Sequence, residues 1–413
     1  MTQLWARVWH QFWALPLACA VAAGGLGLAL CAVDATLQTS LSLPFLFAGG
    51  PEGARSLLSA IITSMISFTG LVFSITIVVL QLTSSQFSPR VLRTFLDDRF
   101  NQLTLGVFVA TFVYALVVLR GVRGTAETEP VVPQLAVTLA FGLVLASVVI
   151  FLSYIHHIAQ SIRVATIITH IWTETVQLLD ERHPADRSQQ PSSISRPGSA
   201  HRVPARQAGV LQRIQDDTLQ ELAEKHTVTI CVLRSVGEFV PHGAPLLDVY
   251  GEHVPDTDEL HAAFLVGKER SMDEDVGFGL RQLVDIANRA LSPGINDPTT
   301  AIQVIDHLHD LLRRLATRRL LPRQRLSDNG LVCVDVPQPD FTSYLDLALN
   351  EIGFWGKDDD RIQRRLHVML QDLREAARPE YQSVLTERLA RSGQDRPSIG
   401  FGGSPPPSDV GLR

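Results

Sequence analysis

The sequence predicts an integral membrane α-helical domain of four transmembrane helices, followed by a soluble cytoplasmic α+β region. Long runs of Ala, Val, Leu, Ile and Phe dominate the chain as far as about residue 182, and charged residues, Pro and Gly become frequent only beyond it. Four of these runs are long enough to cross a hydrocarbon layer of about 30 Å. We expect them to be helical because hydrocarbon leaves unpaired backbone groups without a partner.

The predicted spans cover residues 13–33, 57–82, 103–119 and 132–154, and none contains an acidic or basic residue. The first follows Arg7 and ends in small residues, so a cleaved signal peptide is the alternative interpretation. Its apolar core is too long for a typical signal. Trp5, Trp9 and Trp13 also favour a span, because indole rings accumulate at the membrane–water interface.

The distribution of arginines between the spans predicts the orientation in the membrane. The loop between the second and third spans carries Arg90, Arg93 and Arg99, whereas residues 34–56 contain only Arg55. In the loop between the third and fourth spans, two arginines lie beside two glutamates. Because Lys and Arg favour the cytoplasmic side, both termini are expected in the cytoplasm.

Small polar residues recur on one face of the second span at intervals of three, four or seven residues. They are Ser59, Thr63, Ser67, Gly70, Ser74 and Gln81. Two interpretations stay open. Such residues let neighbouring helices approach closely and form hydrogen bonds across the interface. Alternatively, they line a narrow pore at the axis of a homo-oligomer.

The segment after the second span predicts an interfacial elbow helix near residues 88–101. Ser88 is a suitable N-cap and Pro89 fits the first helical position. The elbow has an apolar side, and Arg90, Arg93 and Arg99 are available for lipid phosphate groups. The alternative is a simple helical lead-in to the third span.

The fourth span continues without a breaker to about residue 182, which predicts a helix of roughly 75 Å. Its part beyond the membrane, residues 156–183, forms a helical stalk in this interpretation. His156, His157 and His170 lie along it without the i, i+4 spacing of a metal site, so interfacial or solvated histidines are expected.

A soluble domain is predicted beyond the stalk. Residues 184–200 are rich in Ser, Pro, Gln and Arg and predict a flexible linker, and residues 391–413 predict a disordered tail. Residues 201–390 form the cytoplasmic α+β domain. Its predicted strands cover residues 201–205, 227–233 and 331–336, and its predicted helices include residues 211–224, 341–352, 360–377 and 379–390. The glycine-rich run 237–247 resembles a hairpin of biotinyl or lipoyl-type barrel-sandwich modules, although no lysine stands there to carry a cofactor.

The run from residue 281 to 301 is the most informative part of the soluble half. An apolar helical face ends at Ser-Pro-Gly, and an Asp-Pro pair then suits the start of a second helix. A well-capped helical hairpin is one interpretation. The other is a subunit contact or small-ligand pocket, because several polar groups converge on one loop. These candidate residues are Arg281, Asp285, Asn288, Asn296 and Asp297.

Composition excludes several classes of function. The net charge of −6 gives no sign of a nucleic-acid partner, which requires a basic face. The four cysteines have neither metal nor redox spacing, so buried thiols are expected and neither a metal nor a cofactor is predicted. We find no catalytic motif, and the spans lack the ionisable residues that mark intramembrane sites, so an enzyme is not expected.

Two motifs together resemble the bacterial predicted membrane proteins catalogued as domain of unknown function, family 2254. Residues 73–76 (Phe-Ser-Ile-Thr) lead to residues 81–90 (Gln-Leu-x-Ser-Ser-Gln-Phe-Ser-Pro-Arg), and residues 290–301 read Ala-Leu-Ser-Pro-Gly-Ile-Asn-Asp-Pro-Thr-Thr-Ala. The resemblance extends from the first span to about residue 380. It implies a multi-pass protein of the bacterial inner (plasma) membrane, and it brings no assigned reaction.

Two functions follow as hypotheses. One is a homo-oligomeric ion channel in which the second span lines the pore and the cytoplasmic domain gates it. The other is a membrane-anchored scaffold or sensor whose cytoplasmic domain binds a partner or small ligand. The lipid bilayer is the partner that the spans require. The sequence does not identify a ligand of the soluble domain.

Overall fold

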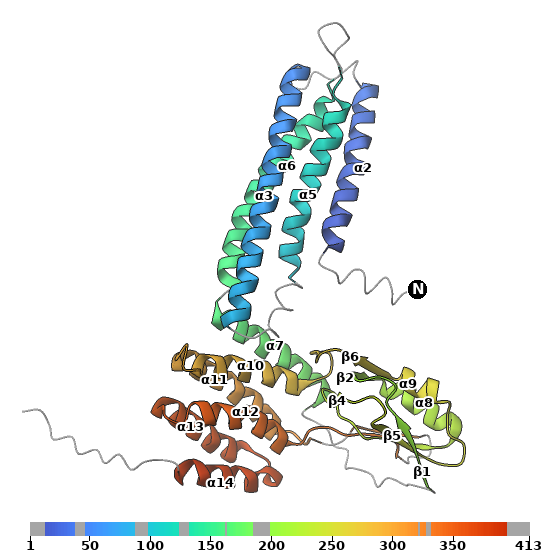
Figure 1. The fold of residues 1–413 in the computed structure, drawn as a ribbon, viewed down its shortest axis with the longest axis vertical. Coiled ribbons are helices and arrows are strands. Elements are labelled where there is room, and N and C mark those ends of the chain that lie inside the picture. Colours follow the sequence, from blue (N-terminus) through green and yellow to red (C-terminus); the bar gives the residue numbers. More distant parts are fainter. Residues whose placement is uncertain are drawn as a thin grey trace, which may run out of the picture. The chain divides into compact units, whose positions relative to one another are not determined.

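The structure is a computed structural model of the chain (Figure 1). It describes residues 13–37, 46–86, 98–123, 132–161, 163–184, 199–320, 323–327 and 332–394. The chain divides into two compact units, Met1–Ile167 and Ile168–Arg413. We call the first the membrane unit and the second the soluble unit.

Within the described residues, the membrane unit contains four long apolar helices. They are α2 (Ala14–Leu37), α3 (Pro51–Gln86), α5 (Arg99–Gly121) and α6 (Gln134–Ser161) (Figure 1). Each is long and apolar enough to cross a membrane, so the prediction of four spans is confirmed. The central helix is α5, which packs against α2, α3 and α6 and has 50% of its most apolar stretch buried, against 11% in α2.

Small residues bring α2 and α5 close together. A Cβ placed on Gly106 would lie 3.2 Å from the Cys19 sulfur, and one placed on Gly121 would lie 3.0 Å from the Cys31 sulfur. Because residue numbers rise together along this contact, the two helices run parallel. Small side chains at a membrane helix interface allow this approach, since lipid supplies no hydrophobic drive between helices.

Aromatic and polar contacts join the other helices of the bundle. The rings of Phe68 on α3, Phe108 on α5 and Phe151 on α6 form one layer, with centroids 5.0, 6.1 and 6.4 Å apart. One turn further along α6, the Tyr154 hydroxyl shares a 2.9 Å hydrogen bond with Thr76 of α3. The buried hydroxyl groups of Tyr154 and Thr76 therefore pair between two helices, which lowers the cost of placing them in an apolar bundle.

The soluble unit begins with most of α7 (Val164–Arg182) and continues with two sheets. The described strands are β1 (Ala200–Pro204), β2 (Gly209–Ile214), β3 (Thr229–Val232), β4 (Phe239–Val240), β5 (Pro245–Tyr250), β6 (Phe264–Gly267), β7 (Arg323–Leu326) and β8 (Val332–Val336). One sheet has the order β1-β5-β3-β8-β7 and the other β4-β2-β6. Neighbouring strands are antiparallel except β3 and β8, which pair in parallel. Residues of both sheets share one apolar core.

Seven further helices are described in the soluble unit. They are α8 (Asp216–His226), α9 (Thr257–Ala262), α10 (Val276–Leu291), α11 (Pro298–Ala316), α12 (Phe341–Trp355), α13 (Asp360–Ala376) and α14 (Pro379–Gln394). The last five form a helical layer in which α10 packs against α11 and α12, and α13 packs against α11 and α14 (Figure 1). The α+β class predicted for this half is thereby confirmed.

The helix predicted over residues 211–224 was wrong in its first part. Residues 209–214 form strand β2, and α8 begins only at Asp216. Leu211 and Ile214 are three residues apart, which suits a helix face, yet both are buried in the shared core. A bulge between Leu211 and Arg213 brings these two side chains to the same side of the strand. Because of this bulge, buried residues of the strand are three positions apart, which is the spacing expected of a helix.

The continuous helix predicted from residue 132 to 182 was also wrong. α6 ends at Ser161, and α7 begins at Val164 with the Arg163 carbonyl accepting from the N–H groups of Thr166 and Ile167. β-Branched residues crowd positions 162–169, and such side chains lose rotamer freedom in a helix. From Ile168 onwards α7 packs into the soluble unit instead of forming an isolated stalk.

Several predictions fall on residues that the structure does not describe. Arg90 and Arg93 of the predicted elbow are among them, whereas Arg99 is the exposed first residue of α5, which Asp98 caps. Most of the predicted linker 184–200 and most of the tail 391–413 also lie outside the described residues.

Candidate functional site

The small polar residues of α3 lie on the side of the helix opposite to its buried face. All six candidates, namely Ser59, Thr63, Ser67, Gly70, Ser74 and Gln81, are exposed in the single chain. The buried face of the same helix carries Leu58, Met65 and Val72. At about 100° per residue, the centres of these two faces are nearly half a turn apart. We call the exposed set the α3 stripe.

Two hydroxyl groups of the α3 stripe, those of Thr63 and Ser67, are hydrogen-bonded to their own helix. Thr63 Oγ1 donates to the Ser59 carbonyl at 2.9 Å, and Ser67 Oγ donates to the Thr63 carbonyl at 3.1 Å. A Cβ placed on Gly70 would meet no atom within 4 Å. The stripe therefore makes no close packing contact within the described part of the chain, and the hydroxyl oxygens still have free acceptor capacity.

Three of the five soluble candidates come together on α10. The Arg281 guanidinium donates to Asp285 at 2.8 Å and to both carboxylate oxygens of Glu351 at 2.5 and 2.8 Å. Asn288 donates to the same Glu351 at 2.5 Å. The hydrogen bond with Glu351 raises the pKa of Arg281. These polar groups thus join α10 to α12, and their donors are already engaged.

The other two candidates form the turn between α10 and α11. Asn296 adopts a left-handed backbone (φ 49°), which Asn tolerates better than most residues. Asp297 caps α11, accepting from the Thr300 N–H at 3.1 Å and from the Thr300 hydroxyl at 2.6 Å. These hydrogen bonds from Thr300 lower the pKa of Asp297. The sequence therefore identified a real capping motif, whose carboxylate is used in building the turn.

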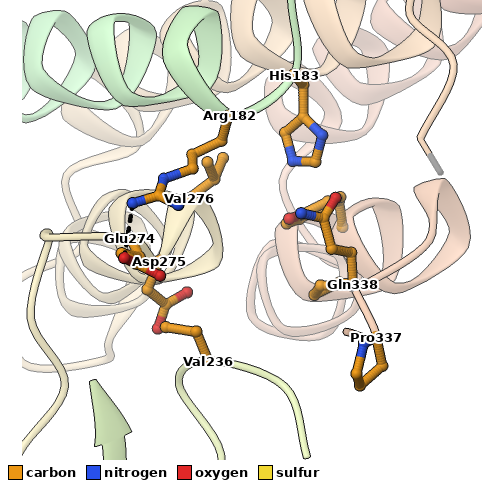
Figure 2. Close-up of a pocket in the computed structure, with 10 residues that line it drawn as sticks. Arg182, His183, Val236, Glu274, Asp275, Val276, Pro337 and Gln338 are labelled. Atoms are coloured by element: carbon orange, nitrogen blue, oxygen red, sulfur yellow. Dashed lines mark ion pairs between the residues drawn. The ribbon is translucent and has the colours of Figure 1, made fainter. Parts of the chain in front are cut away.

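A small polar cavity of the soluble unit lies where the end of α7, the start of α10 and the start of α12 meet (Figure 2). Its volume is about 30 Å³, which is room for about two water molecules. The lining residues are Arg182, His183, Val236, Glu274, Asp275, Val276, Pro337, Gln338, Pro339 and Tyr344. In this conformation the cavity is too small for an organic ligand.

The charges around this cavity are paired. Arg182 forms a 2.8 Å ion pair with Glu274, as drawn in Figure 2. Asp275 accepts two hydrogen bonds from Arg270, at 2.7 and 2.9 Å, and also caps α10. Gly237 adopts a left-handed backbone directly against Asp275, where a Cβ would overlap the carboxylate. The Arg182–Glu274 ion pair therefore ties the end of α7 to the segment before α10, and Arg270 holds the capping carboxylate of Asp275.

Sequence reasoning missed Glu351 and every residue of this cavity. Glu351 lies 70 residues beyond Arg281, and no local pattern reports such a distant contact. The sequence analysis placed Gly237 in a glycine-rich run, but it did not predict that Gly237 lies against Asp275. Among the residues that the structure describes, no three His, Cys, Asp or Glu side chains are grouped to hold a metal ion.

Comparison with known proteins identifies the family. The model of a family described as predicted membrane protein, DUF2254, matches residues 9–372. Uncharacterised proteins of Mycobacterium bovis and Mycobacterium tuberculosis are 35% identical over 338 residues, which is 79% of this chain but only 64% of theirs. The chain thus spans less than two thirds of the length of these curated relatives. No solved structure matches it. Because this family model covers most of the chain, the chain belongs to the DUF2254 family of predicted membrane proteins.

Proposed function

We propose that this protein is a homo-oligomeric ion channel of the bacterial inner membrane, with the α3 stripe lining a pore between subunits. The observation that carries the proposal is the exposure of all six stripe residues on the face of α3 opposite to the bundle core. Small polar groups gain nothing from lipid contact, whereas a neighbouring α3 or a narrow water path can use them. The proposal assigns the chain no catalytic activity.

The use of small residues elsewhere in the bundle supports this role. Close packing inside the subunit uses Gly106 and Gly121 of α5 against the cysteines of α2. The α3 stripe has no such contact among the described residues, so an internal packing role leaves it unexplained. The arginine distribution further supports a subunit with both termini in the cytoplasm, where the soluble unit can respond to cellular signals.

The test is ion flux from proteoliposomes that contain the purified full-length chain, together with the mass of the detergent-solubilised complex. Ser67→Leu is expected to reduce flux several-fold because a bulky apolar side chain replaces a small one on the stripe. Ser153→Leu is the matched control, since Ser153 is an exposed serine of α6 whose hydroxyl also bonds its own helix, to the Val149 carbonyl. A monomeric mass with no flux would overturn the proposal, as would equal effects of the two variants.

The second candidate function is a membrane-anchored sensor or scaffold. The Gln338 Oε1 atom favours it, because this buried acceptor at the polar cavity has no hydrogen-bond partner among the described residues. Binding of a donor group there would contact the ends of three helices. A photoreactive residue in place of Ile295, which is exposed on the α10–α11 turn, tests for a protein partner in cells. If crosslinking captures nothing beyond a second copy of the chain, the scaffold function loses its support.

A further inference from the structure

Two aromatic side chains at the end of α12 are exposed to solvent. Phe354 is 63% exposed and Trp355 is 47% exposed, and they are the last two residues of the helix. Their rings stand edge to face with centroids 5.4 Å apart, and Lys357 Nζ lies 5.7 Å from the centre of the Phe354 ring. These contacts restrict the two rings, so a partner that binds them loses little of their side-chain entropy.

The exposed turn between α10 and α11 lies at the same end of the helical layer. α10 and α12 run in parallel, because a Cβ on Gly277 would lie 3.6 Å from the Tyr344 ring near their starts, whereas Asn288 donates to Glu351 near their ends. Both helices therefore end on the same side of the layer. Ile295 follows the end of α10 in a tight turn and is 41% exposed.

Gly353 leaves a bare stretch of helix next to the two aromatic residues. A Cβ placed there would meet no atom within 4 Å, and Gly353 is not among the positive-φ glycines of the described residues. Glycine is unfavourable inside a helix, and neither packing within the described chain nor backbone conformation requires it at this position. A partner side chain that lies against the bare backbone would explain it. We call Ile295, Gly353, Phe354 and Trp355 the end patch.

The charges beside the end patch favour a second copy of the chain over a lipid surface. Lys357 is exposed, and so are Asp358 and Asp360 directly after it. The two carboxylates disfavour contact with anionic lipid headgroups. In a two-fold contact the same surface of both copies meets, so Lys357 of one copy can face the carboxylates of the other. The surface thus complements itself in charge, and it offers both rings and bare backbone.

The size of the end patch also fits copies that are already held together. Stable interfaces between separate proteins bury about 800 Å² on each partner, which is more than four residues cover. The membrane spans confine all copies of this chain to one bilayer, and confinement of this kind raises their effective concentration. A small contact is then sufficient to pair the soluble units of one oligomer.

We propose that the end patch is a two-fold contact between the soluble units of two copies of this chain. Phe354 and Trp355 of one copy pack over Gly353 of the other, and the exposed charges form the polar rim. Buried tryptophans surrounded by such a rim carry much of the binding energy of protein interfaces. The inference rests on the proposed homo-oligomer and assigns the surface through which its soluble units meet.

Photocrosslinking of the full-length protein in proteoliposomes tests this contact. The photoreactive residue p-benzoylphenylalanine replaces Phe354, and two differently tagged copies are co-expressed so that crosslinks between copies are recognised. Mass spectrometry is expected to find crosslinks to residues 351–360 of the second copy. The same residue in place of Phe239 is the matched control, because Phe239 of β4 is 61% exposed and lies outside the end patch. Its yield of crosslinked dimer is expected to be several-fold lower.

Gly353→Leu, added to the chain with the photoreactive residue at position 354, is the second variant. It should lower the yield of crosslinked dimer several-fold, because leucine fills the place that the rings of the other copy occupy. The unfolding temperature should stay close to that of the parent, since an added Cβ there meets no atom of the chain within 4 Å.

Three results overturn the contact. They are capture of phospholipid or of another protein in place of a second copy, equal yields from positions 354 and 239, and a yield that Gly353→Leu leaves unchanged. An oligomer that conducts ions without this crosslink removes only the end-patch contact and leaves the proposed function standing. A crosslinked dimer that passes no ions does the reverse.

Discussion

Thr175 of α7 lies directly against Gly279 of α10, so that a methyl group on Gly279 would overlap both the hydroxyl and the methyl of Thr175. Thr175 is fully buried, and its hydroxyl donates to the Ile171 carbonyl at 2.6 Å. Gly279 has an ordinary helical backbone, since it is not among the positive-φ glycines of the described residues. Space, and not backbone conformation, is therefore the reason for glycine at this position.

Gly279→Ala is expected to destabilise the soluble unit. Overpacking costs about 1–3 kcal/mol, and the better helix propensity of alanine recovers at most about 1 kcal/mol of this. Thermal unfolding of the full-length protein in detergent, followed by tryptophan fluorescence, measures the change. Adding Thr175→Ala to the same chain should recover part of the loss, because it removes the two side-chain atoms that the introduced methyl group would overlap most.

Gly353→Ala is the matched control for this prediction. Gly353 is also in a helix of the soluble unit, and a Cβ there would meet no atom within 4 Å. This variant is expected to unfold at the same temperature as the parent or slightly higher. Equal destabilisation by the two substitutions would show that close approach of α7 and α10 is not what requires Gly279.

The contact between α7 and α10 illustrates what the sequence could predict in this fold. The apolar faces of both helices were readable from their spacing, and so was the Ser-Pro-Gly turn that follows α10. Their mutual packing was not readable, because it depends on a pair of residues about one hundred positions apart. The break after Ser161 was missed because the apolar pattern of the sequence continues across it.

Asp297 gives the soluble unit a specific dependence on pH. Hydrogen bonds from Thr300 lower its pKa in the folded chain below the ordinary value of 3.8. A carboxyl group with a lowered folded pKa contributes stability above its unfolded pKa, and this contribution disappears as the pH falls through the folded pKa. Asp297→Ala should therefore cost about 1 kcal/mol at pH 7 and progressively less below about pH 4. Unfolding midpoints of parent and variant at both pH values measure the difference.

Thr300→Val is the companion variant, since it removes the hydroxyl that donates to Asp297 at 2.6 Å and keeps the backbone donor. It should weaken the pH dependence without abolishing it. A constant difference between the Asp297→Ala variant and its parent from pH 7 to pH 3 would mean that the carboxylate is not the capping group.

The α2–α5 interface also depends on glycine for close approach of two helices. Gly106 faces the Cys19 sulfur, whereas Gly142 is exposed on α6, where an added Cβ would meet no atom within 4 Å. Gly106→Leu should separate the two helices at a cost of about 1–3 kcal/mol, and Gly142→Leu should be tolerated in lipid. The fraction of each variant that stays monodisperse after heating in detergent distinguishes them. Similar survival of both would argue against close α2–α5 packing.

For the candidate sites too, the sequence predicted which residues share one helix face, but it did not predict the contacts between residues far apart in the chain. The α3 stripe was readable because its members share one helix, and the structure adds that this face is exposed. Arg281, Asp285 and Asn288 were readable as one face of α10, but Glu351, which accepts from Arg281 and Asn288, comes from α12. Asn296 and Asp297 follow this cluster in sequence, yet they form the turn before α11, in which Asp297 caps the helix and Asn296 adopts a left-handed backbone.

Asp34 joins the end of α2 to the start of α6 inside the membrane unit. Its buried carboxylate accepts from the N–H groups of Leu135 and Ala136 at 3.3 and 3.0 Å. These groups have no partner within α6, so Asp34→Ala leaves them unsatisfied at a cost of about 1–3 kcal/mol. Asp34→Asn keeps an acceptor oxygen and should retain much of the stability. Thr36→Ala is the control, because Thr36 is exposed and, among the described residues, its hydroxyl bonds only the Val33 carbonyl of its own helix. If Asp34→Ala and Thr36→Ala survive heating in detergent equally well, the carboxylate does not hold α6 to α2.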